Sequence, residues 1–366
     1  MLDEEKIEKL LKVISGISGE YPILSTHVDP DAFADAATLK TIIEQKKKKI
    51  KVPIYFCDEV DPGQNIKIFE TLNLAKTMKP ISELDQSKLT QFALVDANSI
   101  KDGRMPNNLD FDKFPRPNII IDHHPSSAVE EDNEFYWIEE GLGSASTMMV
   151  ELVQALDIDL SKSEIDNLPS LLSVGIYTDT NSLVNCTQRD NDAFNAMRKI
   201  ADYDVWRQLT TYKIPRSLMK HEKMVSESII LEKAESQGVI VAGIGFVNAE
   251  EINHIAFIAN RMIRYDGINQ IYIWCINVAT SQIIISARSS TDASKSLKEK
   301  LHDKLGGKSG TRKIGDISLG GGRLHFNTGD FGELSKLDKK CQESFEQLAQ
   351  NVMESIFLPE KEDEKK

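Results

Sequence analysis

The sequence lacks the features of a membrane or secreted protein. It contains no apolar run of about 18 residues, which is the length that a membrane-spanning helix needs. The first residues, Met1-Leu2-Asp3-Glu4-Glu5, are acidic and lack the basic start and apolar core of a secretory signal. We therefore expect no membrane partner.

Cysteine is also scarce, with four residues in a chain of 366. The cysteines are far apart and form no short spacing that would hold zinc or frame a disulfide-rich domain. Scattered cysteines suit a reducing compartment, so we predict a cytoplasmic location. They are Cys57, Cys186, Cys275 and Cys341.

Basic residues are outnumbered: 44 Lys and Arg stand against 57 Asp and Glu, which gives a formal net charge of −13. A surface of that sign repels a long nucleic-acid duplex unless a basic patch is segregated. Small anionic substrates remain compatible with it, because a bound metal can reverse the local field.

The length and an apolar content of 40% are enough for two domains, each with its own core. We expect a first domain over residues 1–202, a connector over 203–225 and a second, smaller domain over 226–357. The charged residues 358–366 are expected to form a disordered tail.

The first part of the chain alternates short apolar runs with helical patterns. This alternation predicts an α/β domain with a mostly parallel sheet and flanking helices. The expected strands are 21–26, 51–56, 92–95 and 118–121, and the expected helices are 3–18, 34–47, 63–74, 144–156, 190–202 and 216–233.

The second part has longer strand patterns. Ala279-Thr280 separates two of them, which predicts a tight antiparallel hairpin within a mixed sheet. A glycine-rich loop is expected after residue 305. The other expected elements are strands at 237–246, 269–278 and 281–288 and helices at 249–263, 292–305 and 333–355.

Histidine and aspartate follow the predicted strands of the first domain where those strands end. Because ligands bind beyond the carboxyl ends of parallel strands, we expect these side chains to converge at one edge of the sheet. Asp179 follows another apolar stretch, 171–176, and can join them. The other residues are His27, Asp29, Asp31, Asp96 and Asp122-His123-His124.

The residue types at this edge indicate a metal site. Several carboxylates cannot crowd together unless cations neutralise them, because like charges oppose each other's ionisation. Carboxylates and imidazoles without thiolates favour Mn²⁺ or Mg²⁺. Two such ions about 4 Å apart can share a carboxylate and a water, and that water becomes a hydroxide nucleophile. The pattern therefore predicts hydrolysis of phosphoesters or phosphoanhydrides.

Each of these residues has a simpler interpretation when it is taken alone. An aspartate after a strand is often a helix cap, and for Asp96 in isolation capping is the better interpretation. A lone His27 is more often a satisfied surface or core residue. Adjacent His123 and His124 after a buried strand are harder to place without partners, and the joint order of the residues favours a metal centre.

The order of the motifs resembles the DHH phosphoesterase superfamily, which includes RecJ nucleases, nanoRNase/pAp phosphatases, cyclic-di-AMP phosphodiesterases and family II inorganic pyrophosphatases. The resemblance covers about residues 20–330 and is greatest to the nanoRNase/pAp phosphatase-like, RecJ-related branch. Its motifs are His27-Val28-Asp29-Pro30-Asp31-Ala32, Val95-Asp96, Asp122-His123-His124-Pro125 and Thr178-Asp179-Thr180.

The resemblance implies roles for these residues. Asp96 would bridge two Mn²⁺ ions per chain, with Mg²⁺ or Co²⁺ as alternatives. His124 would contact the substrate phosphate or orient the site, and Asp122 would support a neighbour. The implied metal ligands are His27, Asp31, Asp96, His123 and Asp179.

Two further motifs, at 286–290 and 320–325, resemble the substrate-binding DHHA1 domain of the same superfamily. Arg288, Ser289 and the glycines Gly320, Gly321 and Gly322 would clamp a remote phosphate or base. Glycines let backbone N–H groups approach an anion closely, and Arg323 and His325 can donate to phosphate oxygens. The alternatives are a plain flexible turn at the glycines and a surface cation at Arg288.

The first motif departs from the pattern His-x-x-Pro-Asp-x-Asp that is usual in pAp phosphatases. Phe33 stands at the second aspartate position and cannot ligate a metal. We favour Asp29 as the replacement ligand. The alternatives are Asp35 at the start of the next helix and a weakened second metal site.

The last motif departs as well, since three glycines rather than four come before Arg323-Leu324-His325. The preceding residues 306–313 are rich in hydrogen-bond donors but do not fit the P-loop pattern. We expect either a mobile lid over the substrate or a simple surface loop.

Together these observations predict a metal-dependent phosphoesterase that acts on small nucleotides. The expected substrate is pAp, a nanoRNA of a few residues, or a linear or cyclic dinucleotide, and a homodimer is possible. The alternatives are a manganese-dependent pyrophosphatase-like hydrolase and a non-catalytic nucleotide-binding regulator that has lost one metal site.

Overall fold

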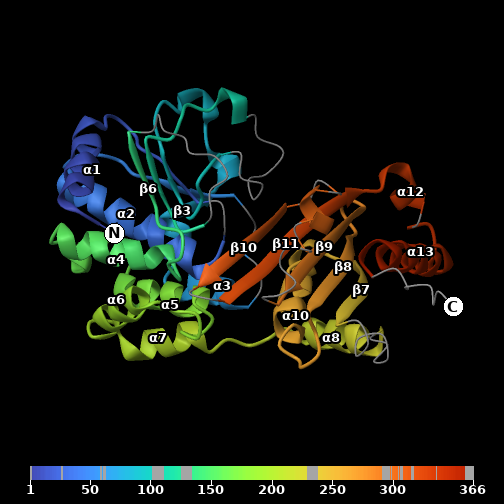
Figure 1. The fold of residues 1–366 in the computed structure, drawn as a ribbon. Coiled ribbons are helices and arrows are strands. Elements are labelled where there is room, and N and C mark those ends of the chain that lie inside the picture. Colours follow the sequence, from blue (N-terminus) through green and yellow to red (C-terminus); the bar gives the residue numbers. More distant parts are fainter. Residues whose placement is uncertain are drawn as a thin grey trace. The chain divides into compact units, whose positions relative to one another are not determined.

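The computed structural model of the chain forms two compact units, unit 1 (Met1–Lys213) and unit 2 (Ile214–Lys366) (Figure 1). Within the described residues, every helix is too short or too polar to cross a membrane. The structure describes residues 2–25, 28–57, 60, 63–100, 111–124, 134–228, 238–290, 297, 299–303, 305, 308–314, 317–334 and 336–358.

Six strands of the described part of unit 1 form one sheet in the order β3-β2-β1-β4-β5-β6. All neighbouring pairs are parallel, which confirms the predicted parallel α/β architecture. The strands are β1 (Ile23–Ser25), β2 (Ile54–Phe56), β3 (Met78–Pro80), β4 (Ala93–Val95), β5 (Ile119–Asp122) and β6 (Phe135–Ile138).

The central strands of this sheet are covered on both faces. Ile119 and Ile121 of β5 belong to one apolar cluster, whereas Ile120 between them belongs to a second cluster on the opposite face. Burial on both faces is typical of parallel strands and explains why the run is continuously apolar rather than alternating. The sheet edge at the ends of these strands is therefore fixed by packing.

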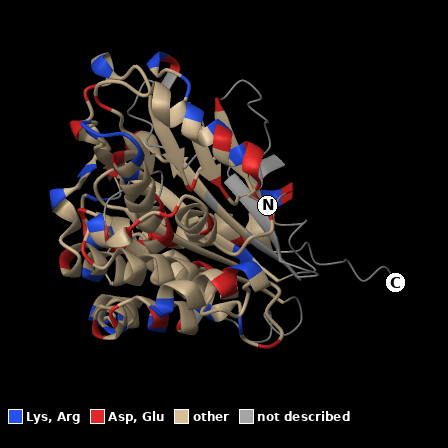
Figure 2. Ribbon diagram, turned by 90° about the vertical axis from the view of Figure 1, so that its left-hand side faces the viewer, with Lys and Arg blue, Asp and Glu red and all other residues tan. Residues whose placement is uncertain are grey.

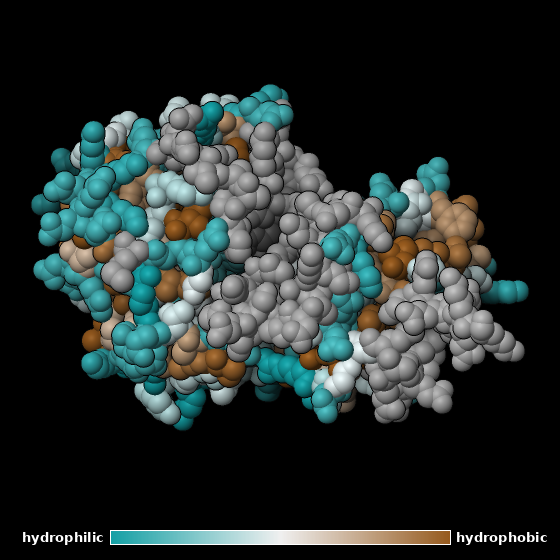
Figure 3. Space-filling model, viewed as in Figure 1, coloured by the Kyte–Doolittle hydropathy of each residue, from teal (hydrophilic) through white to brown (hydrophobic). Residues whose placement is uncertain are grey.

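Helices pack against the sheet of unit 1. Helix α1 places Leu10, Val13 and Ile14 in the core, and the outer surface over α1 is mostly hydrophilic (Figure 3). The helices are α1 (Glu4–Gly16), α2 (Pro30–Lys46), α3 (Gln64–Thr71), α4 (Ala145–Ala155), α5 (Leu168–Asp179), α6 (Gln188–Arg198) and α7 (Tyr203–Thr210), with short 3-10 turns at Leu74–Lys76, Ile81–Glu83, Gln86–Lys88, Phe111–Lys113 and Leu160–Lys162.

Helix α2 begins four residues earlier than the expected start at residue 34. Asp29 is its N-cap, and its side chain accepts a hydrogen bond from the Ala32 backbone N–H, while Pro30 occupies the first helical position. An acidic cap followed by proline is a common helix start. This start places Asp31 and Asp35 on one face of α2, one turn apart.

Unit 2 contains a five-stranded mixed sheet in the order β10-β11-β9-β8-β7. Strands β7 and β8 are parallel, whereas β8-β9, β9-β11 and β11-β10 are antiparallel, so the predicted mixed sheet and the hairpin at 279–280 are confirmed. The strands are β7 (Val239–Val247), β8 (Gln270–Asn277), β9 (Gln282–Ser289), β10 (Lys308–Ile314) and β11 (Ile317–Asn327), and the helices are α8 (Arg216–Ser228), a 3-10 turn η6 (Ala249–Glu251), α10 (His254–Met262), a π-helical turn (Glu299–Asp303), α12 (Gly329–Leu334) and α13 (Lys339–Phe357).

The prediction of a glycine-rich loop in unit 2 is wrong. Strand β10 occupies most of the segment that was expected to be a lid or surface loop, and Gly320, Gly321 and Gly322 lie in the middle of β11. Strand β11 pairs with β9 on one side and β10 on the other. Two flanking strands therefore impose an extended backbone on residues whose own preference is for turns.

Charges of both signs are distributed over the helices. On the face that Figure 2 presents, Lys and Arg alternate with Asp and Glu along the ribbon. On this face the two signs of charge are interspersed rather than segregated.

Candidate metal centre

Asp96 follows strand β4 directly and turns sharply out of the sheet. Its φ is 52°, in the left-handed region that aspartate tolerates better than most residues. Its backbone N–H donates to the Ile121 carbonyl at 3.0 Å, which ties it to the next strand. The side chain is almost fully buried. The backbone turn therefore carries a carboxylate into the protein at the sheet edge.

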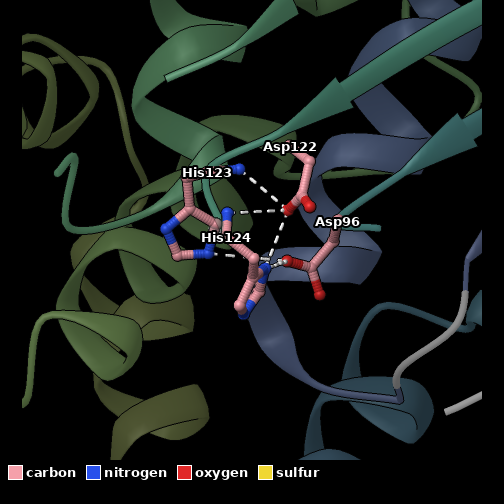
Figure 4. Close-up of side chains that lie close together, drawn as sticks. All are labelled: Asp96, Asp122, His123 and His124. Carbon is pink, nitrogen blue, oxygen red and sulfur yellow. Dashed lines mark hydrogen bonds and ion pairs between the residues drawn. The ribbon is translucent and has the colours of Figure 1, made fainter. Parts of the chain in front are cut away.

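The triplet at the end of β5 is organised around Asp122, the last residue of the strand. Its Oδ1 atom accepts from the backbone N–H of His123 at 2.8 Å and of His124 at 3.2 Å, and it lies 2.7 Å from Nδ1 of the His124 ring (Figure 4). The other oxygen accepts from the Asn98 side chain at 3.0 Å. These contacts fix the orientation of the two histidines relative to Asp122.

His123 is the point at which the acidic residues converge. Its Nε2 atom lies 3.2 Å from Asp179 Oδ2, 3.6 Å from Asp96 Oδ1 and 3.8 Å from Asp31 Oδ2. The ring is buried, and Nδ1 lies 3.3 Å from the Leu142 carbonyl, which favours a proton on Nδ1. That tautomer presents the Nε2 lone pair to the three carboxylates.

The side chain of Asp31, a residue of α2, contacts the N-terminus of helix α4. One carboxylate oxygen accepts from the Ser144 hydroxyl and from the Ser146 backbone N–H at 3.0 Å, and the other accepts from the Ala145 N–H at 2.9 Å. Donors at a helix N-terminus stabilise a carboxylate through hydrogen bonds and through the helix dipole. Helix α4 thus fixes the position and orientation of Asp31.

Asp179 enters the centre from a helix. The stretch 171–176, which we treated like the strands before it, lies within α5, and Asp179 is the last residue of that helix. Helix α5 passes close to α2, because a Cβ on Gly175 would lie 3.1 Å from Asp31 Cα and 2.6 Å from Ser146 Oγ. Only glycine permits this approach.

Phe33, which stands where a metal-binding aspartate is usual, lies in the apolar core. Its side chain is buried in the apolar core and packs against Phe69, with ring centroids 5.8 Å apart. On helix α2 it faces away from Asp31 and Asp35, which lie two residues to either side. A phenylalanine here contributes to the core and leaves the acidic face of the helix intact.

Asp29 and Asp35 both stand near the centre, in different settings. Asp29 uses Oδ1 to cap α2, with the Ala32 N–H at 2.9 Å. Asp35 is fully buried; Oδ1 accepts from the Ser146 hydroxyl at 3.1 Å, and Oδ2 has no hydrogen-bond partner in the described structure. A buried carboxylate oxygen in that state is costly unless a cation or a proton neutralises it.

Crowding changes the acidity of these aspartates. Burial, and then repulsion from Asp179, raises the pKa of Asp31 from 3.8 to about 6. Burial also raises the pKa of Asp29 and Asp35 well above the usual range, with further repulsion from neighbouring aspartates. Like charges this close oppose ionisation, so divalent cations would be held strongly by the ionised cluster.

The donor set fits a divalent cation. Two groups of side chains each place their ligand atoms within 4.8 Å of one another: Asp31, His123 and Asp179 form one, and Asp96, Asp122, His123 and His124 form the other. His123 belongs to both groups. Carboxylate and imidazole donors without thiolate suit Mn²⁺, Mg²⁺ or a similar ion.

The structure brings most of the expected ligands together. Asp31, Asp96, His123 and Asp179 converge, whereas His27 lies outside the described residues. Sequence reasoning missed the hydroxyl groups of Ser144 and Ser146, which donate to the acidic residues. The serine that begins the predicted helix 144–156 was the available signal, because serine is a preferred N-cap.

The two motifs of unit 2 lie on neighbouring strands. Arg288 of β9 is paired with Gly321 of β11, and Ser289 with Gly320. The Arg288 Nη1 atom would lie 3.6 Å from a Cβ on Gly321, so the guanidinium extends over this glycine. Asn260 accepts from Arg288 Nε at 2.5 Å and holds the side chain in place. The motifs therefore form one continuous surface.

We expected the glycines to bring backbone N–H groups close to an anion, and this expectation is wrong. The backbone groups of Gly320, Gly321 and Gly322 face the ladders to β9 and β10, so they are not presented to an anion as in a loop. Ser289 is buried and its hydroxyl has no partner among the described residues, whereas His325 is exposed. For Arg323 the structure defines the backbone, which pairs with Ser286.

No family model matches the sequence, and no curated protein is significantly similar to it. Solved structures match it by fold. An exopolyphosphatase-related protein from Bacteroides fragilis has a TM-score of 0.63 at 14% identity, with 94% of this chain and 98% of that chain covered.

Two further structures match less closely. A putative family II inorganic pyrophosphatase from Methanococcus jannaschii has a TM-score of 0.40 at 14% identity, covering 87% of this chain and 91% of that one. Exonuclease RecJ bound to manganese has a TM-score of 0.43 at 10% identity, covering 96% and 95%. The chain has the fold of the exopolyphosphatase-related protein, which is the fold that its resemblance to the DHH phosphoesterases implied.

Proposed function

We propose that the protein is a metal-dependent phosphoesterase that hydrolyses small nucleotides. The observation that carries the proposal is the position of His123 Nε2, which lies within 3.2 to 3.8 Å of carboxylates from three separate elements. Carboxylates this close repel one another when no cation is bound, and bound cations would neutralise them. The exopolyphosphatase-related protein with this fold is consistent with phosphate chemistry.

Each residue of the centre would have a distinct role. His27, Asp31, His123 and Asp179 would hold divalent ions, and Asp96 would bridge them; Mn²⁺ is the expected ion. Bound ions of this kind lower the pKa of a coordinated water and supply a hydroxide nucleophile. His124, whose side chain is 37% exposed, would meet the substrate phosphate. Asp122 would hold the His124 ring in position.

The substrate class follows from charge and from unit 2. The net charge of −13 disfavours long duplexes, so pAp, a nanoRNA or a dinucleotide is the expected substrate. In unit 2, Arg288 would bind a remote phosphate or base, with His325 as a further donor on the same sheet. The bare strand at Gly320, Gly321 and Gly322 would leave room for the ligand beside the Arg288 guanidinium.

A substrate panel tests the proposal. Purified full-length protein with Mn²⁺ should release product from pAp, short RNA or a dinucleotide. Asp96→Asn should lower the rate by at least about 100-fold, because asparagine tolerates the left-handed backbone but removes the charge. Asp166→Asn, at an exposed position in the turn before α5, is the matched control and should retain the wild-type rate.

The same panel separates the alternatives. Turnover of pyrophosphate alone would favour a pyrophosphatase-like enzyme. Binding of nucleotides without turnover of any compound would favour a regulatory protein and would exclude the phosphoesterase. Phe33 lies in the core and leaves Asp31 and Asp35 on the opposite face of α2, so its presence does not by itself favour the regulatory alternative.

A further inference from the structure

Unit 2 contains a second group of metal-binding side chains that has no part in the proposed phosphoesterase. It comprises His221 of α8, Glu251 at the end of η6 and His254 at the start of α10, and one ligand atom of each lies within 4.8 Å of the others. All three belong to unit 2, so the arrangement does not depend on unit 1.

The two histidines are buried in an apolar setting. His221 lies between Leu218 and Val225 on the buried face of α8, and both of these residues are in a core cluster with Ile255 of α10. His221 and His254 are only 4% and 5% exposed. Burying two imidazoles among aliphatic side chains is unfavourable unless their nitrogens are satisfied.

The contact between the rings leaves a polar atom unsatisfied. The two Nδ1 atoms are 2.9 Å apart, so without another species one ring must donate a proton to the other. The Nε2 atom of His254 is buried and has no hydrogen-bond partner in the described part of the chain. A cation held by the two Nδ1 atoms would replace the proton that their contact otherwise needs, whereas it would leave Nε2 of His254 unchanged.

A cation between the rings fits the spacing. With Zn–N bonds of about 2.0–2.1 Å, tetrahedral ligation separates two ligand nitrogens by about 3.3 Å. The rings would have to part by only about 0.4 Å from their present contact, which a small side-chain rotation supplies.

Glu251 supplies the charge that the histidines lack. Its Oε2 atom accepts from the Asn248 backbone N–H at 3.3 Å, which fixes the carboxylate at the end of η6 and leaves Oε1 for a cation. Nearby, Arg261 of α10 donates to Glu222 of α8 at 2.9 Å, so the two helices are already joined beside the cluster. The ligand set is two imidazoles and one carboxylate.

We propose that His221, Glu251 and His254 bind one divalent transition metal, with Zn²⁺ as the preferred ion and a water in the fourth position. Two histidines and one glutamate form a three-ligand set that zinc uses in proteins. The ion would fasten α8 to α10, and so fix the first helix of unit 2 on its sheet.

Zinc content of the full-length protein tests this site. After dialysis against Zn²⁺ and then metal-free buffer, the wild-type chain should retain one more zinc than Glu251→Gln, whose glutamine keeps the Asn248 hydrogen bond. Glu250→Gln, the exposed neighbour on the same turn, should match the wild type. Asp96→Asn should keep the extra ion, because Asp96 belongs to the centre in unit 1.

Cobalt substitution gives a second readout. Co²⁺ bound by four ligands absorbs strongly in the visible range, and this absorption should be lost in Glu251→Gln and in His221→Ala but kept in Glu250→Gln. If Glu251→Gln retains both the extra zinc and the cobalt spectrum, the site is absent and the histidines are only a hydrogen-bonded core pair. Should His221→Ala fail to fold, the glutamine variant still decides.

Discussion

Asp31 and Ser144 join helices α2 and α4 at the metal centre: the Ser144 hydroxyl donates to an Asp31 oxygen while the same hydroxyl accepts from the Ser146 N–H at 3.1 Å. Ser144 is also the N-cap of α4. One hydroxyl therefore serves helix stability and ligand orientation together, and the two effects can be separated by experiment.

Ser144→Ala should destabilise the protein and weaken metal binding. Loss of an N-cap costs about 1 kcal/mol, and loss of a hydrogen bond that orients a ligand weakens metal affinity by about 10-fold or more. Urea denaturation and Mn²⁺ titration measure the two effects. Ser161→Ala removes an exposed hydroxyl that bonds Asp159 and should leave Mn²⁺ affinity unchanged. Unchanged affinity in Ser144→Ala would contradict the orienting role.

Gly175→Ala should separate α5 from α2. The new methyl group would lie 2.6 Å from Ser146 Oγ and 3.1 Å from backbone Cα of Asp31, so the helices must move apart. Overpacking of this kind costs about 1–3 kcal/mol. Because Asp179 ends the same helix, Mn²⁺ affinity should fall too.

The matched control for that variant is Gly16→Ala. A Cβ at Gly16 would meet nothing within 4 Å, so its stability should stay within about 1 kcal/mol of wild type. Thermal unfolding of both variants, with and without Mn²⁺, checks the prediction. An equal melting temperature for the two alanine variants would show that the close approach at Gly175 does not constrain the centre.

The stability of the metal-free protein should depend on pH through Asp31. Its pKa rises from 3.8 to about 6 on folding. Between these values the folded state holds more protons than the unfolded state, so stability falls as pH rises through this window. The full loss, about 3 kcal/mol, persists above pH 6.

Unfolding by urea in EDTA at pH 4.5 and pH 7 measures this dependence. Asp31→Asn should reduce the fall in stability across that window, and the raised pKa values of Asp29 and Asp35 account for the fall that remains. Added Mn²⁺ should reverse the trend in the wild type, because the ion binds the ionised carboxylate and competes with the proton. A metal-free wild type that gains stability from pH 4.5 to pH 7 would contradict the raised pKa.

Much of the centre could be predicted from the sequence, because the carboxyl ends of parallel strands lie at one edge of the sheet. The run Ile119-Ile120-Ile121 identifies a strand covered on both faces, and Asp122-His123-His124 must then follow it. Asp179 lies beside His123, as expected, although its stretch is helical. A short apolar run does not distinguish a buried strand from a buried helix, and here the helix prevailed.

The strand at the glycine segment and the histidine cluster of unit 2 could not be predicted as well from the sequence. Gly320, Gly321 and Gly322 become a strand only because β9 and β10 flank them, which is a tertiary effect that local preference opposes. His221 and His254 are single histidines on different helices, and nothing in their spacing pairs them. The one signal was a polar residue inside the apolar stripe of α8.

Either Asp29 or Asp35 would be the additional metal ligand. Substitutions that separate helix capping from metal ligation distinguish the two. Asp29→Asn keeps an N-cap of equal quality but removes the charge, whereas Asp29→Ala removes both and should cost about 1 kcal/mol of stability. If Asp29 ligates, both variants should lose one Mn²⁺ per chain, and only the alanine variant should lose the cap. Metal analysis with urea denaturation separates these results.

Asp35→Asn should stabilise the metal-free protein at pH 7, because it removes a buried charge whose Oδ2 atom has no partner in the described residues. If Asp29 is the ligand, as we favour, this variant should still bind as many Mn²⁺ ions as the wild type. Loss of one ion in Asp35→Asn with full content in Asp29→Asn would transfer the role to Asp35. The buried face of α2 would then carry two ligands, Asp31 and Asp35, one helical turn apart.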